Sequence, residues 1–139
     1  MRATLTSSLF VLALAALSAS TAASLSAHHS FAAEFDASKP VSLEGTLTKV
    51  VWMNPHGWIY VDVPGADGKV VNWAIEFGSP GALLRRGLRV TDFPPGIKLT
   101  VKGYLAKNGT PTANASSVVL PDGRNLFTAS SNPNAPDVR

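Results

Sequence analysis

The stretch VSLEGTLTKVVWMNPHGWIYVDV, residues 41–63, decides the fold. Its first part, Val41–Met53, is long and rich in β-branched residues, and its last part, Trp58–Val63, alternates between two faces. The NPHG between them has the composition of a turn, with Asn at the first position, Pro at the second and Gly at the fourth. The stretch therefore predicts a β-hairpin, and Gly45 within the first strand predicts a bulge or a bend.

Three further segments have the pattern of strands. Val70–Phe77 alternates clearly and places Trp73 and Glu76 on opposite faces. Ile97–Ala106 repeats the alternation, and Thr112–Leu120 shows it more weakly. Together with the hairpin, these segments predict five strands.

A short helix is predicted between the third and fourth strands. Ser79 and Pro80 suit an N-cap and a first helical position, and Gly87 is a natural C-terminal cap. The order β-β-β-α-β-β, with its long bent first strand, fits a mainly β fold, a five-stranded OB-like barrel with one short helix between strands 3 and 4. A small open β-sandwich is the alternative, and residues 121–127 could add a short edge strand.

Residues 1–27 have the pattern of a secretory signal peptide. A short basic start precedes the almost entirely apolar Leu9–Leu17, and small residues follow up to Ala27. Ser and Thr residues interrupt the apolar run before it reaches the roughly 20 residues that span a bilayer. We therefore expect cleavage after Ser26 or Ala27 and a periplasmic or secreted mature protein with no transmembrane segment.

The rest of the chain predicts one domain, residues 28–128, and a tail. The tail, residues 129–139, consists largely of Pro, Asn and Ser and is expected to be disordered. The chain has 12 basic and 9 acidic residues, an excess too small to indicate a surface for nucleic acid or anionic lipid. It has no Cys, which excludes disulfides and thiolate chemistry.

Catalysis has little support in the sequence. The chain has only 3 His residues, and no Ser-His-Asp set can be recognised around them. A Gly-rich phosphate loop and a paired-carboxylate pattern are also missing. We therefore assign no catalytic residues and expect a binding function; the alternative, an oxidative copper enzyme, would require a substrate surface that the sequence does not reveal.

Several motifs together resemble a known family. They are HHSFAAEFD from His28, NPHGWIYVDV, WAIEFGSP, LLRRGL, PGIKLTVKGYLAKNGT and LPDGR. From His28 to about Phe127 the chain resembles the small exported bacterial proteins grouped as domain of unknown function 6152. The resemblance implies bacterial export and a barrel-like β domain, but no assigned activity. The family pattern centres on His28, His29, Ser30, Phe31, Asn54, Pro55, His56, Trp73, Glu76, Pro80 and Gly87.

The His residues suggest a metal site that exists only after processing. Cleavage after Ala27 would leave His28 with a free amine beside its imidazole, and a second imidazole would complete a T-shaped set suited to copper. Cleavage after Ser26 would instead put His at the third position, which suits a square plane around Cu(II) or Ni(II). The predicted metal ligands are His28, His29, His56 and Glu76, with Asp36 as an alternative source of oxygen.

Each of these residues also has a structural interpretation. The His pair could simply be solvated, and His56 could hydrogen-bond within its own turn. Glu76 is either a solvated outer residue or lies in a cleft beside the helix start, where the helix dipole favours its charge. Phe31 and Phe35 are expected to dock the N-terminal arm on the sheet.

The aromatic and basic residues leave a second function open. OB barrels bind ligands on aromatic platforms, which here would be built from Trp52, Trp58, Tyr60 and Tyr104, although packing is the simpler role for these side chains. The basic residues near the helix end are interpreted as structural, because cations offset the negative pole of a helix: Arg85, Arg86 and Arg89. Two hypotheses remain, periplasmic copper binding or delivery, and a non-enzymatic OB-type module for a protein or small-molecule partner.

Overall fold

Residues 31–128 are the part of the chain that the structure, a computed structural model, describes. Its strands are β1 (Phe35–Val51), β2 (Gly57–Pro64), β3 (Val70–Phe77), β4 (Lys98–Ala106), β5 (Thr112–Val119) and β6 (Asn125–Phe127). Its helices are α2 (Phe31–Glu34), α3 (Pro80–Arg85) and the 3-10 helix η2 (Val90–Asp92). The predicted signal peptide and the predicted tail lie outside the described residues.

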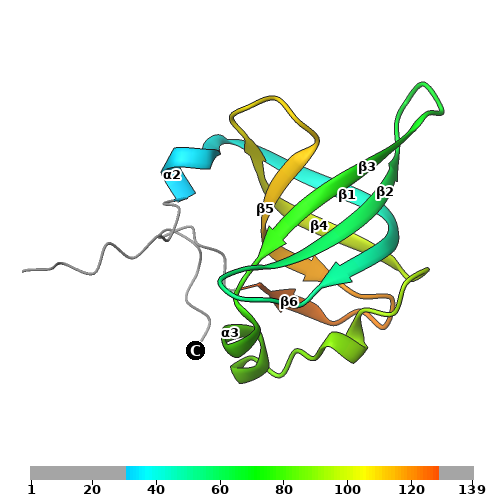
Figure 1. Cartoon of the computed structure of the whole chain (residues 1–139). Coiled ribbons are helices and arrows are strands. Elements are labelled where there is room, and N and C mark those ends of the chain that lie inside the picture. The colour runs from blue at the N-terminus through cyan, green and yellow to red at the C-terminus, as the bar shows by residue number, and fades with distance from the viewer. Residues whose placement is uncertain (1–30, 129–139) are drawn as a thin grey trace, which may run out of the picture.

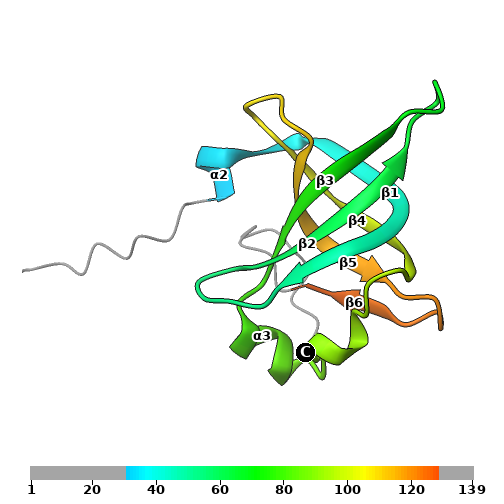
Figure 2. The same cartoon turned by 45° about the vertical axis from the view of Figure 1, so that its right-hand side comes forward.

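The strands form a sheet whose hydrogen bonding closes on itself. The order is β3-β2-β1-β4-β5-β6, with antiparallel pairing between neighbours, and β3 also pairs with β5 in parallel. Strands β1 to β5 therefore form a ring of pairings, and β6 continues the sheet beyond β5 (Figure 1). Helix α2 lies toward one end of this ring and α3 toward the other (Figure 2). The prediction of a mainly β fold is confirmed, with a sixth strand at the edge.

The predicted hairpin is confirmed as the antiparallel pair β1–β2. Val51 lies opposite Trp58, and the connecting turn contains a cis Asn54–Pro55 peptide bond. The alternation predicted for β2 matches the burial of its side chains. Ile59 and Val61 are fully buried, while Trp58, Tyr60 and Asp62 are half-buried.

The first strand differs from the prediction in two respects. It begins at Phe35 and not at Val41, because β4 continues far enough to pair Phe35 with Ala106. Its register against β2 shifts between Leu47 and Lys49 and not at Gly45. Gly45 serves close packing instead, since a Cβ there would clash with the backbone of β2.

The predicted helix between strands 3 and 4 is confirmed as α3. The Ser79 hydroxyl accepts a hydrogen bond from the Ala82 N–H at 3.4 Å, Pro80 is the first residue, and Gly87 follows the helix with a φ of 81°. The structure has two short helices that the sequence did not predict: α2 before β1, and η2 before β4. Both are single short turns, which leave little periodicity in a sequence.

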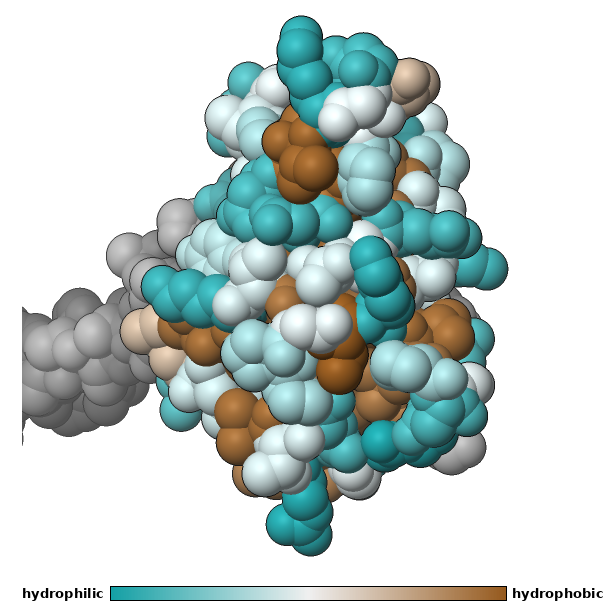
Figure 3. Space-filling model, turned by 90° about the vertical axis from the view of Figure 1, so that its right-hand side faces the viewer, coloured by the Kyte–Doolittle hydropathy of each residue, from teal (hydrophilic) through white to brown (hydrophobic). Residues whose placement is uncertain are grey.

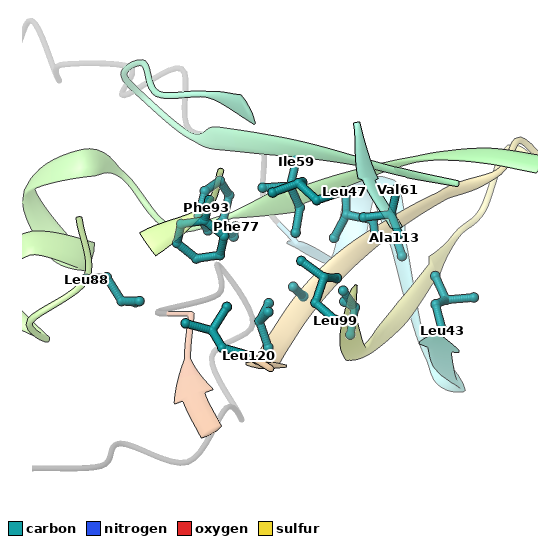
Figure 4. Packing of buried hydrophobic residues seen from close by; sticks show 14 of the residues in the cluster. Leu43, Leu47, Ile59, Val61, Phe77, Leu88, Phe93, Leu99, Ala113 and Leu120 are labelled. Atoms are coloured by element: carbon teal, nitrogen blue, oxygen red, sulfur yellow. The ribbon is translucent and has the colours of Figure 1, made fainter. Parts of the chain in front are cut away.

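Apolar side chains fill the interior of the ring. Leu47, Ile59 and Val61 point toward the same centre, and Phe77 lies against Phe93 with ring centroids 5.8 Å apart (Figure 4). Full burial of each such side chain stabilises the fold by about 1.5–3 kcal/mol.

Large exposed apolar residues are few among the described residues and are spread over the β2–β3 hairpin, the β1–β2 turn, α3 and η2: Met53, Val70, Val71, Leu84 and Val90. On the face shown in Figure 3, hydrophobic surface is broken into small areas by polar side chains. This face therefore presents no broad apolar surface of the kind that marks a large protein interface.

Candidate functional site

A buried polar cluster lies where β3 meets β5, and it consists of His56, Glu76 and Asn114. The amide Nδ2 of Asn114 donates a hydrogen bond to Oε1 of Glu76 at 3.1 Å. Nδ1 of His56 lies 3.3 Å from the same oxygen. Glu76 is 5% exposed and Asn114 0%. One carboxylate oxygen is thus shared by an amide and an imidazole away from bulk water.

The turn before β2 brings His56 to Glu76. The Gly57 N–H donates a hydrogen bond to the carbonyl of Gly78 at 3.1 Å, which ties the start of β2 to the end of β3. Gly57 also allows Phe77 to pack closely, since a Cβ at position 57 would lie 2.7 Å from its ring. These contacts hold the turn against the last residues of β3, where Glu76 lies.

Strand pairing on both sides holds Asn114. Asn114 lies in β5, where its backbone pairs with Glu76 of β3 on one side and with Tyr104 of β4 on the other. The sequence does not predict Asn114 as a site residue, because Thr112–Leu120 shows only the weak alternation of a strand. The available signal was the residue type, since Asn is depleted in strands and therefore needs a partner when it is buried in one.

Burial distinguishes the two interpretations of Glu76. A carboxylate loses hydration when it is buried, and hydrogen bonds and a cation must compensate for that loss. Asn114 supplies such a bond, and His56 can supply positive charge when it is protonated. The interpretation of Glu76 as a solvated outer residue is therefore wrong, and the structure instead buries it in contact with His56 and Asn114.

The structure brings together two of the four predicted metal ligands, His56 and Glu76. His28 and His29 lie outside the described residues. Within residues 31–128, no group of three or more His, Cys, Asp or Glu side chains could hold a metal ion. A complete site would therefore need ligands from outside residues 31–128.

Asp36, the alternative oxygen ligand, is engaged by Ser38 near the start of β1. Its carboxylate accepts hydrogen bonds from the Ser38 hydroxyl at 2.6 Å and the Ser38 N–H at 3.0 Å. These bonds lower the pKa of Asp36 below its usual 3.8, with the hydroxyl as the largest cause. These local contacts account for Asp36 by its bonds to Ser38 within β1.

The two phenylalanines dock the start of the described chain on β4, as predicted. Phe31 and Phe35 are 6% and 3% exposed, and the Phe31 ring meets the edge of Tyr104 with centroids 5.6 Å apart. The Lys107 N–H donates to the carbonyl of Glu34 at 2.8 Å. Because Tyr104 pairs with Asn114, Phe31 is anchored one strand away from the polar cluster.

A groove of about 530 Å³ is lined by residues from strands that neighbour the cluster, but by none of its three members. Trp58 in its lining is the cross-strand partner of Glu76, and Thr112 precedes Asn114 by two residues on β5. The lining is a mixture of aromatic, charged and small residues: Ala33, Glu34, Phe35, Trp58, Ala106, Lys107, Asn108 and Thr112.

The four aromatic residues considered as a platform do not share one surface. Trp52 packs against Phe77, with ring centroids 5.7 Å apart, and so belongs to the core. Tyr104 packs against Phe31, and Tyr60 lies beneath the Lys49 ammonium at 5.4 Å. Packing is therefore the role of Trp52 and Tyr104.

The basic residues near the helix lie at element ends. Arg85 is in the last turn of α3 and Arg86 is its C-cap. Arg89 precedes η2, and its N–H donates to the carboxylate of Asp92 at 2.7 Å. The positions of Arg85 and Arg86 agree with the predicted offset of the negative pole of the helix, whereas Arg89 lies at the start of η2 and not at a helix end of that sign.

Comparison with known proteins identifies a family and no individual relative. A search of curated proteins and a search of solved structures each find no match. Within residues 31–128 there is no helix with the length and apolar character needed to cross a membrane. The model of a family of unknown function, DUF6152, matches residues 15–115, which is most of the chain. The chain therefore belongs to the DUF6152 family.

Proposed function

We propose that this chain is an exported bacterial protein that binds or delivers copper through a processed N-terminal His28, with His29, His56 and Glu76 completing the site. The observation that carries the proposal is the 3.3 Å contact between Nδ1 of His56 and Oε1 of Glu76 in a buried cluster. Imidazole is the commonest metal ligand in proteins and suits copper.

The cluster has the chemistry of a metal-binding histidine with its supporting carboxylate. Metal-binding imidazoles usually donate their second ring N–H to a carboxylate, which fixes the tautomer and the ring orientation. Glu76 faces Nδ1 of His56, so Nε2 is the nitrogen that this arrangement assigns to copper. Asn114 in turn orients Glu76. Glu76 thereby completes the site through His56, by holding the Nδ1 side of its ring while Nε2 binds the ion.

The chain before residue 31 is long enough to supply the other ligands. Phe31 is anchored beside Tyr104, and Asn114 and Glu76 follow on the next two strands. Neighbouring strands lie about 4.8 Å apart, so Glu76 is roughly 10 Å from Tyr104, against which Phe31 packs. Three residues in extended conformation span up to about 10 Å, a length of the same order as this separation.

Copper titration of the exported protein tests the proposal. Mass spectrometry first locates the cleavage site, and the affinity of the mature protein for Cu(II) is then compared with that of a form carrying one extra N-terminal residue. The extra residue removes the amine of His28 from coordination, so the affinity is expected to fall. Equal affinity of the two forms would overturn the proposal.

Two variants and a control test the cluster. Glu76→Gln is expected to weaken copper binding by about 10- to 100-fold, the range seen when groups that support a metal ligand are lost, and His56→Gln, which removes the ligand itself, by at least as much. Asp67→Asn is the matched control, because Asp67 is an exposed acid in the turn between β2 and β3 that pairs with Lys69. It should leave the copper affinity unchanged.

A second candidate, an OB-type binding module, is favoured by a different observation. The ring of pairings among β1 to β5 agrees with an OB-type barrel, and the groove beside Trp58 has room for a small ligand. A fragment library screened by NMR against the metal-free protein tests this function. It predicts shifts of the Trp58 indole and the Thr112 amide that persist in the His56→Gln variant, and unshifted signals would reject it.

A further inference from the structure

We propose that the groove beside Trp58 is a binding site for an uncharged sugar, whose ring stacks on the indole and whose hydroxyls bond to the turn between β4 and β5. The groove holds about 530 Å³, within the range of about 300–1,000 Å³ that small-molecule sites occupy. All of its lining residues lie within residues 31–128. The site is independent of copper binding; it rests on the OB-type module proposed above and gives that module a ligand class.

Small side chains between aromatic ones make the hollow. On the outer face of the sheet, Ala74 of β3 pairs with Tyr60 of β2 on one side and with Thr112 of β5 on the other. On the next strand, Ala106 of β4 pairs with Phe35 of β1. Small side chains of three adjacent strands therefore lie between Tyr60 and Phe35, and the groove follows this low part of the sheet.

Trp58 forms the wall of the groove on the β2 side. Its side chain is half-buried while its neighbours Gly57 and Ile59 are buried, so the indole projects from the outer face. Trp52 and Trp73 instead pack against the hydrophobic core. The π face of an indole is negative and attracts the weakly positive C–H groups on one face of a sugar ring. Of the three tryptophans, Trp58 is therefore the one that a sugar in the groove can stack on.

The turn between β4 and β5 presents polar groups whose positions are already fixed. Oδ1 of Asn108 accepts hydrogen bonds from the Thr110 N–H at 3.0 Å and from the Thr110 hydroxyl at 2.7 Å. The hydroxyls of Thr110 and Thr112 lie 2.9 Å apart. These bonds hold the Asn108 amide while its Nδ2 remains to donate, and the Thr112 oxygen can accept. A sugar hydroxyl both donates and accepts, so it matches this mixed set, and groups that are already ordered lower the entropic cost of binding.

The charges of the groove favour an uncharged ligand. Lys107 and Glu34 contribute one positive and one negative side chain to its lining. The Lys107 ammonium donates to the carbonyl of Ala32 at 2.5 Å, and the Lys107 N–H donates to that of Glu34 at 2.8 Å, which ties the turn to α2 (Figure 1). A nucleotide could also stack on an indole, but phosphates need more positive charge than one ammonium beside a carboxylate provides. The lining therefore suits a neutral sugar better than a nucleotide.

NMR titration of the metal-free exported protein tests the site. The probes are glucose, N-acetylglucosamine, maltose and cellobiose, with AMP as a charged molecule that can also stack. At least one sugar should shift the indole N–H of Trp58 and the side-chain amide of Asn108 in a saturable way, and AMP should bind more weakly than that sugar. Trp58→Leu keeps an apolar side chain but removes the stacking surface, so it should raise the Kd for the sugar about tenfold.

Asn108→Asp separates the hydrogen bond to the sugar from the shape of the turn. Aspartate keeps the oxygen that accepts from Thr110 but loses the Nδ2 donors, so the Kd should rise at least about threefold with little change in Tm. Trp73→Phe is the matched control, because Trp73 packs against the core and does not line the groove. It should leave the Kd unchanged. Thermal unfolding checks that each variant is folded.

The outcomes distinguish the sugar site from the functions proposed above. A lack of saturable shifts with all four sugars, tighter binding of AMP, or an unchanged Kd in Trp58→Leu overturns the sugar site. If members of the fragment library still shift Trp58 and Thr112, the OB-type module stands without it. The copper titration is independent of these results, because no proposed copper ligand lines the groove.

Discussion

Replacing Asn114 with alanine tests whether the polar cluster is held as a unit. The Asn114 side chain is fully buried, and its amide donates to Oε1 of Glu76 at 3.1 Å. A hydrogen bond to a charged group contributes about 1.5–3 kcal/mol, and the small cavity left by truncation adds to the loss. We expect Asn114→Ala to lower the free energy of unfolding by about 2–4 kcal/mol. For a domain of this size, such a loss lowers Tm by at least about 8 °C.

A double-mutant cycle isolates the contact between the two side chains. Urea unfolding of the metal-free protein is measured for Asn114→Ala, Glu76→Ala and the double variant. Because the alanines remove both partners, we expect the effects to be non-additive by at least about 1 kcal/mol. Asn72→Ala is the control, since Asn72 lies exposed on β3 and its amide donates to Asp62 at 2.7 Å. Its cost should stay below about 1 kcal/mol.

Additive effects would refute the reasoning. Each variant lowers the free energy of unfolding relative to the unaltered protein. If the losses of the two single variants sum to the loss of the double variant within about 0.5 kcal/mol, Asn114 does not stabilise the Glu76 carboxylate. The orientation of His56 by Glu76 would then lack the support that the proposed site requires.

Three further predictions concern other parts of the fold. Gly103→Ala should destabilise the protein by about 1–3 kcal/mol in urea, because a Cβ there would clash with the carbonyl oxygen of Asn114; an unchanged midpoint would contradict this packing. Phe31→Ala should expose the start of the chain to limited proteolysis and weaken copper binding, since Phe31 anchors the segment next to the proposed ligands; resistance equal to that of the unaltered protein would argue against this anchor. The pKa of Asp122 is held below its usual 3.8 by the N–H and then the guanidinium of Arg124, so its stabilising contribution is present above pH 3.8 and lost as pH falls through the lowered pKa. Carbon-detected NMR titration should show this pKa moving back toward 3.8 in Arg124→Gln, and an unmoved pKa would exclude the guanidinium as a cause.

Local patterns in the sequence predicted the hairpin, the faces of its second strand and the capped helix. Ile59 and Val61 alternate with half-buried neighbours, so period and burial agree in β2. Ser79 and Gly87 mark the ends of α3 by side-chain and backbone chemistry that needs no distant partner. These features depend on residues close together in the chain, which explains why they can be predicted.

Features that depend on distant partners were not predictable in the same way. The parallel pairing of β3 with β5 joins residues almost 40 positions apart, and it is this pairing that places Asn114 against Glu76. The early start of β1 at Phe35 is hidden because the polar residues that follow have no apolar alternation. Gly45 has the composition of a bulge, but its role in close packing requires the neighbouring strand.

The candidate site also combines features that local sequence predicts with features that depend on distant partners. His56 and Glu76 could be selected by residue type, since imidazole and carboxylate groups are common metal ligands. Their contact depends on how the turn before β2 folds against the end of β3, which no spacing in the sequence specifies. The supporting role of Asn114 and the position of Trp58 become visible only once the strand registers are known.

A crystal structure of the mature protein grown with copper, with the anomalous signal of the metal recorded, tests the central claim most directly. The account predicts a copper peak on the outer face of the sheet, within coordination distance of Nε2 of His56 and of the amine of the first residue, beside Glu76. A peak coordinated by the N-terminal residues alone, away from the turn formed by residues 54–57, would contradict it.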